Sequence, residues 1–364
     1  MKKLISLHYP KIKSLYTRYE RWLMPTTLAC GFLLDYFTFT NIKFSITFTI
    51  LLLYWAVAGA TIFFVHAYDA QKIPQKYRYV RLFAPLLLQF LFGNLFSASL
   101  VFYWFSGVFS ISWPIIAIVI LLMVSNDVFR HYFDKPVVQL AVYFFVTLSI
   151  SSLVLPFLFT SLSPWFFIIA GMASALIFFV FLYCLGKVQP MIQSQRRPVF
   201  AVTGAILLLM NLLYFTNIIP PIPLALREAG LYHSVTKING SYLVKAEKDP
   251  FFKTLFFGQT LHLTTSESMY AYTAVFAPTD LKTTIVHHWQ HYDENKKKWV
   301  SVAELPFDIV GGLRTGYKGY SWISKLDSGR WRVYVENSRG QVLGRIKFNV
   351  ARVEAPAALQ EIIR

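Results

Sequence analysis

Charged residues are scarce in this chain of 364 residues. They make up 15% of the chain, whereas ordinary soluble domains carry about 25%. Hydrophobic residues reach 55%, so the shortage of charge indicates a chain that contacts lipid. These apolar residues fill the first 219 positions and thin out afterwards. The composition therefore predicts a membrane part followed by a more polar part.

Cysteine is nearly absent as well. Cys30 and Cys184 both lie inside hydrophobic segments, so they provide neither a disulfide framework nor the spacing of zinc ligands. The first apolar run is too long for a cleaved signal peptide, and no small-residue cleavage site follows it. We expect no metal and no cofactor.

Acidic residues are the third shortage, with 18 Asp and Glu against 35 Lys and Arg. A nucleic-acid partner is one explanation for such a basic chain. Most of the excess, however, precedes Pro220, where 16 basic residues face 5 acidic ones; after it 19 face 13. A basic bias between hydrophobic segments sets membrane orientation. We therefore expect a lipid bilayer as the partner of the first part, and no nucleic acid.

Seven hydrophobic runs are long enough to span a bilayer, which takes about 20 helical residues. The approximate predicted spans are Leu23–Asn41, Ile46–His66, Leu82–Phe105, Ile111–Phe129, Val137–Thr160, Trp165–Gly186 and Val199–Ile219.

The loops between these runs predict the orientation. Fifteen basic residues lie in the N-terminal arm and in every second loop, and Lys43 alone lies on the other side. The positive-inside rule then places the N-terminus in the cytoplasm, and an odd number of spans sends the C-terminal part across the membrane. We predict a multi-pass protein of the cytoplasmic (inner) membrane with an extracytoplasmic C-terminal domain.

Beyond the last span the periodicity changes from helical to alternating. Leu224–Gly230 is predicted to be a short interfacial helix within a Pro-rich connector. Arg330–Glu336 and Val342–Val350 alternate apolar with polar residues around a Gly-containing turn, which predicts a β-hairpin. Further predicted strands are Gln259–Ser266, Met269–Ala277, Lys282–Tyr292, Trp299–Leu305 and Leu313–Ser324.

Together these features predict an α-helical multispan membrane domain of about seven transmembrane helices, followed by an all-β, immunoglobulin-like sandwich domain. We divide the chain into a transmembrane helical domain at 1–219, a Pro-rich linker at 220–230, the β-sandwich domain at 231–353 and a C-terminal tail at 354–364.

Several motifs resemble a bacterial membrane-protein family with a C-terminal domain of unknown function (number 2914). The motifs are Gly31-Phe32-Leu33-Leu34-Asp35, Gln89-Phe90-Leu91-Phe92-Gly93-Asn94-Leu95-Phe96-Ser97, His287-His288-Trp289, Gly329-Arg330-Trp331-Arg332-Val333 and Gly344-Arg345-Ile346-Lys347-Phe348. The resemblance implies a multispan anchor with a compact C-terminal β domain, and it brings no catalytic residues with it.

Four polar residues inside the predicted spans are candidate site residues. A carboxylate such as Asp35 costs about 2.5–3.5 kcal/mol near mid-membrane, so it indicates function by default. The alternative is that Asp35 is hydrogen-bonded inside the bundle or neutral. Gln89 and Asn94 favour helix packing; a polar pathway formed by Asp35, Asn94 and Asn211 is the alternative.

Two further groups are polar clusters. Asp127 and Arg130 are three residues apart at the inner end of the fourth span, where we predict an interfacial ion pair. His287, His288 and His291 invite comparison with a metal site, but no further ligand is evident nearby, so we expect structural histidines.

Tyr317, Tyr320 and Trp322 form either an exposed partner-binding patch or half of a core. The tail has no GxSxG, HExxH or phosphate-loop motif. We therefore favour a non-enzymatic envelope protein that binds or scaffolds, with an envelope protein or a glycan as ligand. The alternative is a transporter or membrane-embedded enzyme that uses Asp35 and Asn94.

Overall fold

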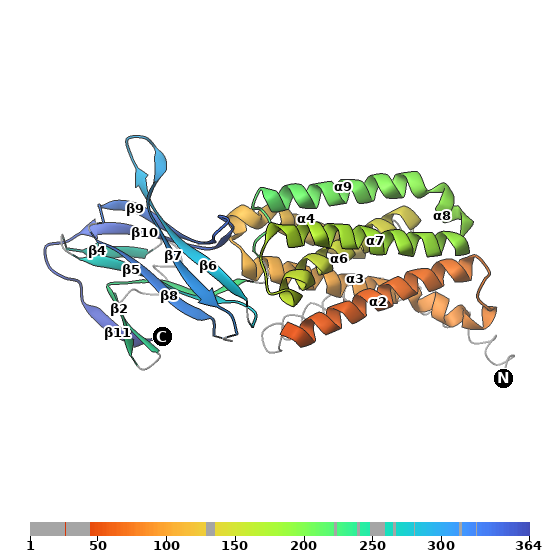
Figure 1. Ribbon diagram of the computed structural model, residues 1–364, viewed down its shortest axis with the longest axis horizontal. Coiled ribbons are helices and arrows are strands. Elements are labelled where there is room, and N and C mark those ends of the chain that lie inside the picture. The colour runs from red at the N-terminus through yellow and green to blue at the C-terminus, as the bar shows by residue number, and fades with distance from the viewer. Residues whose placement is uncertain are drawn as a thin grey trace. The chain divides into compact units, whose positions relative to one another are not determined.

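The structure is a computed structural model. It describes residue 26 and residues 44–128, 135–221, 224–238, 241–247, 259–264, 267–279, 281–312, 315–324 and 326–364. The chain divides into two compact units, one built from helices and one rich in strands (Figure 1).

The helical unit contains six long helices within the described residues. They are α2 (Phe44–Asp69), α3 (Arg78–Ser106), α4 (Phe109–Val128), α6 (Pro136–Leu158), α7 (Pro164–Val188) and α9 (Arg196–Phe215). Two short elements connect them, η1 (Gln75–Tyr77) and α8 (Pro190–Ser194).

All six long helices have the length and apolar composition that a membrane span requires. They match the second to seventh predicted spans, and the multi-pass character is thereby supported. Apart from Thr26, the first predicted span lies outside the described residues, so the total of seven stays a prediction.

Burial separates inner from outer helices. The apolar windows of α3 and α6 are 78% buried, whereas those of the other four helices are 28% to 39% buried. Large apolar side chains on the outer helices are exposed, among them Leu121, Met172 and Leu208 at 66% to 74%. Such a surface is stable where hydrocarbon, not water, surrounds the helices.

Polar side chains of the helices turn inward. The indole of Trp55 on α2 donates to the hydroxyl of Thr147 on α6 at 2.9 Å. Gly59 lets the same two helices approach closely, since a Cβ there would collide with the hydroxyl of Tyr143. Small residues at helix contacts and hydrogen bonds between helices are typical of membrane bundles.

The second unit contains three sheets in the described part of the chain. The first has the order β1 (Ala225–Tyr232), β5 (Ser268–Phe276), β8 (Tyr317–Ser324). The five-stranded sheet has the order β4 (Gln259–Leu263), β10 (Val342–Arg352), β9 (Gly329–Asn337), β6 (Lys282–Asp293), β7 (Lys298–Val310). The small sheet has the order β11 (Leu359–Ile363), β3 (Ser241–Glu247), β2 (Ser234–Ile238).

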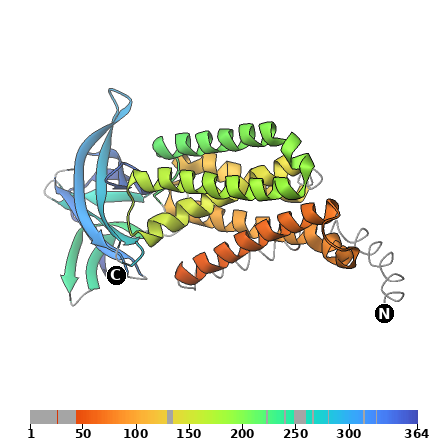
Figure 2. The same cartoon turned by 45° about the vertical axis from the view of Figure 1, so that its right-hand side comes forward.

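Apolar side chains join these sheets into layers. Trp289 of β6, Val333 of β9 and Phe348 of β10 pack with Met269 and Ala271 of β5 in one buried cluster. The five-stranded sheet therefore packs face to face against the first sheet. A second cluster joins the first sheet to the small one, through the following tyrosines and valines: Tyr232, Tyr272, Tyr242, Val235 and Val244. The strands β6 and β7 form a long curved ribbon (Figure 2).

The predicted hairpin is confirmed, because β9 and β10 pair antiparallel over its length. The five other predicted strands correspond to β4, β5, β6, β7 and β8. One pairing is not antiparallel, since β4 runs parallel to β10.

The predicted helix Leu224–Gly230 is wrong. Ala225–Tyr232 is strand β1, paired antiparallel with β5 and shifted by a bulge between Leu226 and Glu228. Its residues have good helix propensity, but burial of alternate side chains against the neighbouring sheet outweighs that local preference. The predicted C-terminal tail contains a strand too, β11, which pairs with β3; β2 and β3 were likewise not predicted.

Candidate functional site

The outer face of the five-stranded sheet collects basic and aromatic side chains. Because side chains alternate along a strand, β9 buries Trp331, Val333 and Val335 and turns its other residues outward. The outward residues of β6, β7, β9 and β10 include seven that we name the basic–aromatic face: Tyr292, Trp299, Arg330, Arg332, Tyr334, Arg345 and Lys347.

The strand register places two cations of this face directly opposite each other. Lys347 of β10 is the cross-strand partner of Arg332 on β9, and Arg345 is the partner of Tyr334. Like charges opposite each other on a sheet destabilise it. This pair therefore destabilises the folded state. Its presence indicates that the two residues serve a purpose other than folding.

Aromatic rings hold the arginines in place. The guanidinium carbon of Arg330 lies 3.8 Å from the ring centroid of Tyr292. That of Arg332 lies 4.2 Å from Trp299 and 4.8 Å from Tyr334. Each such contact contributes about 0.5–1 kcal/mol at exposed sites, so the arginine side chains are ordered on the surface.

Carboxylates accompany only part of the face. Arg330 forms a forked pair with Glu294, at 3.0 and 3.2 Å. Arg332 donates instead to the amide oxygen of Gln290 at 2.7 Å. In the part of the chain that the structure describes, neither Arg332, Arg345 nor Lys347 has an ion pair with a carboxylate.

The local electrostatics reflect this excess of positive charge. The charge of Arg345 is the main cause that lowers the pKa of Lys347, and burial and Arg332 act in the same direction. Burial is the main cause that lowers the pKa of Arg332. A nearby anion would relieve the repulsion, so the arrangement suits a negatively charged ligand.

The same sheet face becomes acidic beyond the basic–aromatic face. His288 on β6 lies 3.6 Å from Glu304 and 3.6 Å from Glu336, and its Nε2 lies 2.9 Å from the hydroxyl of Ser301. Burial raises the pKa of Glu336, although His288 opposes the shift. Here the charges are paired within the protein, in contrast to Arg332 and Lys347.

The three histidines of β6 lie on two faces. His287 is fully buried, and its ring nitrogens lie 2.9 Å from the hydroxyl of Thr273 and 2.8 Å from that of Ser321. Burial lowers the pKa of His287 to about 3, so this ring is neutral and structural. His288 points to the opposite face. Among the residues that the structure describes, no group of His, Cys, Asp and Glu is arranged to hold a metal ion.

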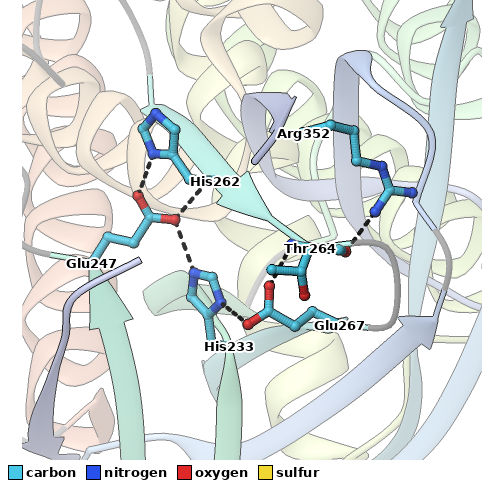
Figure 3. Close-up of polar contacts among 6 residues, drawn as sticks. All are labelled: His233, Glu247, His262, Thr264, Glu267 and Arg352. Atoms are coloured by element: carbon cyan, nitrogen blue, oxygen red, sulfur yellow. Dashed lines mark hydrogen bonds and ion pairs between the residues drawn. The ribbon is translucent and has the colours of Figure 1, made fainter. Parts of the chain in front are cut away.

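A second polar cluster joins three sheets (Figure 3). The carboxylate of Glu247, at the end of β3, lies 2.9 Å from Nε2 of His233 and 2.8 Å from Nδ1 of His262. It also accepts a bond from the backbone N–H of His262 at 2.6 Å. An ionised carboxylate only accepts hydrogen bonds, so both rings donate to it. Burial acts to raise the pKa of Glu247, but the hydrogen bonds from His262 and His233 outweigh it and lower the pKa.

Neighbouring contacts extend this cluster. Glu267 accepts from the backbone N–H of Thr264 at 2.6 Å and lies 4.0 Å from Nδ1 of His233. Arg352 on β10 donates to the carbonyl oxygens of Thr264, at 2.6 Å, and Leu326. The cluster therefore fixes β3 and β4 to the strands beside them.

The predicted aromatic patch is divided between two sides of β8. Tyr317 packs against the buried cluster between the first and five-stranded sheets. Tyr320 and Trp322 lie on the other face, with ring centroids 6.3 Å apart, and Trp322 is 56% exposed. Because successive side chains of a strand point to opposite faces, the odd-numbered residue 317 faces the other side of β8 from the even-numbered residues 320 and 322.

The predicted intramembrane residues do not converge in the described part of the chain. Gln89 on α3 donates to the backbone oxygen of Asn126 on α4 at 3.1 Å, and Asn126 donates to that of Gln89 at 3.0 Å. Asn94 and Asn211 each donate to a carbonyl one turn back in their own helix, Phe90 and Leu207. The residues Asp35 and Arg130 and the side chain of Asp127 lie outside the described residues.

The similarity of this chain to solved structures is weak. A β-glucosidase from Listeria innocua is 15% identical, with a TM-score of 0.18 over 30% of this chain, which spans 16% of the enzyme's length. The alkylpurine DNA glycosylase AlkC of Pseudomonas fluorescens, bound to DNA with an abasic-site analogue, is 13% identical. Its TM-score is 0.19 over 86% of this chain and 98% of that one. Scores this low carry no argument about fold or function.

No curated protein matches the sequence. A family model does: residues 282–350 match the one described as "Protein of unknown function (DUF2914)". The matched segment contains β6, β7, β8 and β9 and nearly all of β10. It includes every residue of the basic–aromatic face. The C-terminal part of this chain therefore carries the DUF2914 domain, as its sequence resemblance predicts.

Proposed function

We propose that this protein is a membrane-anchored binding protein whose β domain binds an anionic ligand on the extracytoplasmic side. The observation that carries the proposal is the basic–aromatic face, where Arg332, Arg345 and Lys347 share one surface and none has a carboxylate partner among the described residues. Surfaces of one charge sign, kept at a cost to stability, are typical of ligand recognition.

The sequence supports the proposed location. Fifteen basic residues in one set of predicted loops against Lys43 in the other favour a cytoplasmic N-terminus. With seven spans, the β domain then lies outside the cytoplasm. The six described apolar helices agree with a multi-pass anchor.

We also infer that the β domain is a variant of the immunoglobulin-type sandwich. In that fold one sheet holds strands A, B, E and D and the other holds C, F and G, with a buried Trp on strand C. The strands β1, β5 and β8 take the places of A, B and E, and β6, β9 and β10 take those of C, F and G. Trp289 on β6 is fully buried, as this assignment requires.

The binding proposal is tested with the full chain in nanodiscs of zwitterionic lipid and with polyglutamate as a generic polyanion. The test variant replaces the unpaired cations: Arg332→Gln, Arg345→Gln and Lys347→Gln. A control variant removes the same charge from exposed lysines elsewhere in the β domain: Lys237→Gln, Lys282→Gln and Lys298→Gln. We expect the test variant alone to lose affinity, by about tenfold or more. Equal affinities of the two variants would contradict the proposal.

Transport or membrane-embedded catalysis through Asp35 and Asn94 remains the second candidate function. One observation favours it: the amide oxygen of Asn94 is buried and has no hydrogen-bond partner among the described residues. Such an orphaned group in a bundle interior suits an ion or solute. If Asp35→Asn abolishes the cellular function in a chain that still inserts, while the test variant at the face does not, this second function is favoured.

A further inference from the structure

The unpaired cations of the basic–aromatic face form a corner, with Lys347 between Arg332 and Arg345. Lys347 and Arg332 are opposite each other on adjacent strands, which lie about 5 Å apart. Arg345 and Lys347 are two residues apart on β10, a separation of about 7 Å. Three cations spread over about 5 Å in one direction and 7 Å in the other exceed the size of one small ion, and they suit several anionic groups on one chain.

The guanidinium of Arg332 is prepared for a forked contact. It lies over the rings of Trp299 and Tyr334, and its Nε donates a hydrogen bond to Gln290, so its position is restrained. No described residue accepts a hydrogen bond from its two terminal nitrogens. A fixed guanidinium edge with free donors is suited to bidentate bonds with a carboxylate or phosphate.

Neutral hydrogen-bonding groups surround the cations. Asn349 follows Lys347 on the same face of β10 and is exposed, and Thr260 of β4 lies opposite it. The amide of Asn349 and the hydroxyl of Thr260 can form hydrogen bonds with sugar hydroxyls.

Two other polyanions fit the face less well. Single-stranded nucleic acid is bound by stacking bases on free aromatic faces, whereas guanidinium groups already cover Tyr292 and Trp299 at 3.8 and 4.2 Å. A protein binds an anionic bilayer through exposed apolar side chains that lie beside its cations. On this face, amide side chains lie beside the cations instead.

We propose that the basic–aromatic face binds an acidic polysaccharide, a sugar chain that carries carboxylate or phosphate groups. This inference rests on the proposed binding function and names its ligand. The repeated anions lie against Arg332, Lys347 and Arg345, and the sugar hydroxyls contact Asn349 and Thr260 beside them.

The experiment measures dissociation constants for the full chain in zwitterionic nanodiscs with a panel of probes. These are polygalacturonate, polyglutamate of equal charge, neutral dextran, oligothymidine, and vesicles that contain phosphatidylglycerol. We expect polygalacturonate to bind at least about tenfold more tightly than polyglutamate, as one additional good polar contact would provide, and dextran not to bind. The test variant should lose about 100-fold for polygalacturonate, and the control variant less than about threefold.

Every other outcome contradicts one part of the proposal, either the ligand or the binding function. Equal binding of polygalacturonate and polyglutamate, with loss in the test variant, overturns the polysaccharide and leaves the anionic ligand. Tighter binding of oligothymidine or of the vesicles overturns it in favour of nucleic acid or lipid. If the test and control variants bind every probe equally, the binding function itself fails. Hydrogen exchange of β6 and β9, which carry the buried Trp289 and Trp331, verifies in all variants that the sandwich is folded.

Discussion

Lys347 lies beside two arginines on a sheet surface that could have held an acidic residue. Its partner across the strands is Arg332, and the charge of Arg345 lowers its pKa. A cation with a lowered pKa destabilises the folded state while it is charged. The residue therefore opposes folding slightly, which is typical of positions retained for binding.

From this we predict that Lys347→Glu stabilises the β domain while it weakens anion binding. The new carboxylate would face Arg332 and turn a repulsive cross-strand pair into an attractive one, a gain of about 0.5–1 kcal/mol. Thermal unfolding of the full chain in detergent, followed by tryptophan fluorescence, measures the first effect, and polyanion affinity measures the second.

The matched control for this prediction is Lys282→Glu at the start of β6. Lys282 is exposed and lies opposite Val310, so its reversal relieves no like-charge pair. We expect its unfolding temperature to stay within about 1–2 °C of the wild type, since isolated surface charges contribute little. A lower unfolding temperature for Lys347→Glu would show that the cations at the face do not repel one another.

At the scale of elements, Glu247 is the residue through which β3 is fixed to β4. Replacing it by Gln leaves one of its two histidines without an acceptor, because an amide has a single oxygen. We predict that Glu247→Gln costs about 1–3 kcal/mol at pH 7. Hydrogen exchange of β2, β3 and β4 should rise more than that of β9. The control is Glu361→Gln, which removes only an exposed contact with Lys245 at 3.4 Å and should cost under about 0.5 kcal/mol.

The same carboxylate predicts a pH dependence. The folded pKa of Glu247 is below its ordinary value of 4.5, so its contribution is fully present above pH 4.5 and is lost as the pH falls through the folded value. The stability difference between wild type and Glu247→Gln should therefore shrink as the pH falls below 4.5. A difference that grows on acidification would contradict this linkage.

Between α3 and α4, the side chains of Gln89 and Asn126 each donate to the other residue's backbone. Asn126→Leu should weaken the bundle by about 0.6–1.7 kcal/mol, the range of polar contacts between membrane helices. The double variant Gln89→Leu with Asn126→Leu should lose less than the sum of the single variants, since the two residues interact. Unfolding in mixed micelles measures all three. Strict additivity would show that the two residues do not act together.

Elements with a strong local pattern could be predicted from the sequence, and elements that depend on distant partners could not. The hairpin of β9 and β10 is visible because Trp331 and Val333 alternate with Arg332 and Tyr334 within one short run. The strand β1 could not be predicted, because Leu226 and Glu228 lie in a run whose residues favour a helix. Only the pairing with β5 makes this run a strand. The register of the hairpin already implied that Arg332 faces Lys347, so half of the candidate site could have been found. The meeting of His233, Glu247 and His262 required three strands separated by loops.

At the scale of the whole molecule, the orientation of the membrane part determines which ligands have access to the β domain. We predict that a cysteine in place of Ser338, an exposed residue in the turn after β9, is labelled by an impermeant maleimide on intact spheroplasts. The background carries Cys30→Ser and Cys184→Ser. A cysteine in place of Gln75, in the predicted cytoplasmic loop before α3, should react only after lysis.

This topology test also separates the two ligand classes that a basic surface attracts. If Ser338→Cys is labelled from outside, the face of Arg332 and Lys347 is presented to the envelope, where acidic polysaccharides occur and nucleic acids are scarce. If only lysed cells are labelled, the positive-inside bias has been overridden and the β domain lies among cytoplasmic polyanions. The basic loops then lie on the outer side, and the same cations would be available to nucleic acid. Reactivity of Gln75→Cys in intact spheroplasts would accompany that result, because residues 75 and 338 are predicted to lie on opposite sides of the membrane.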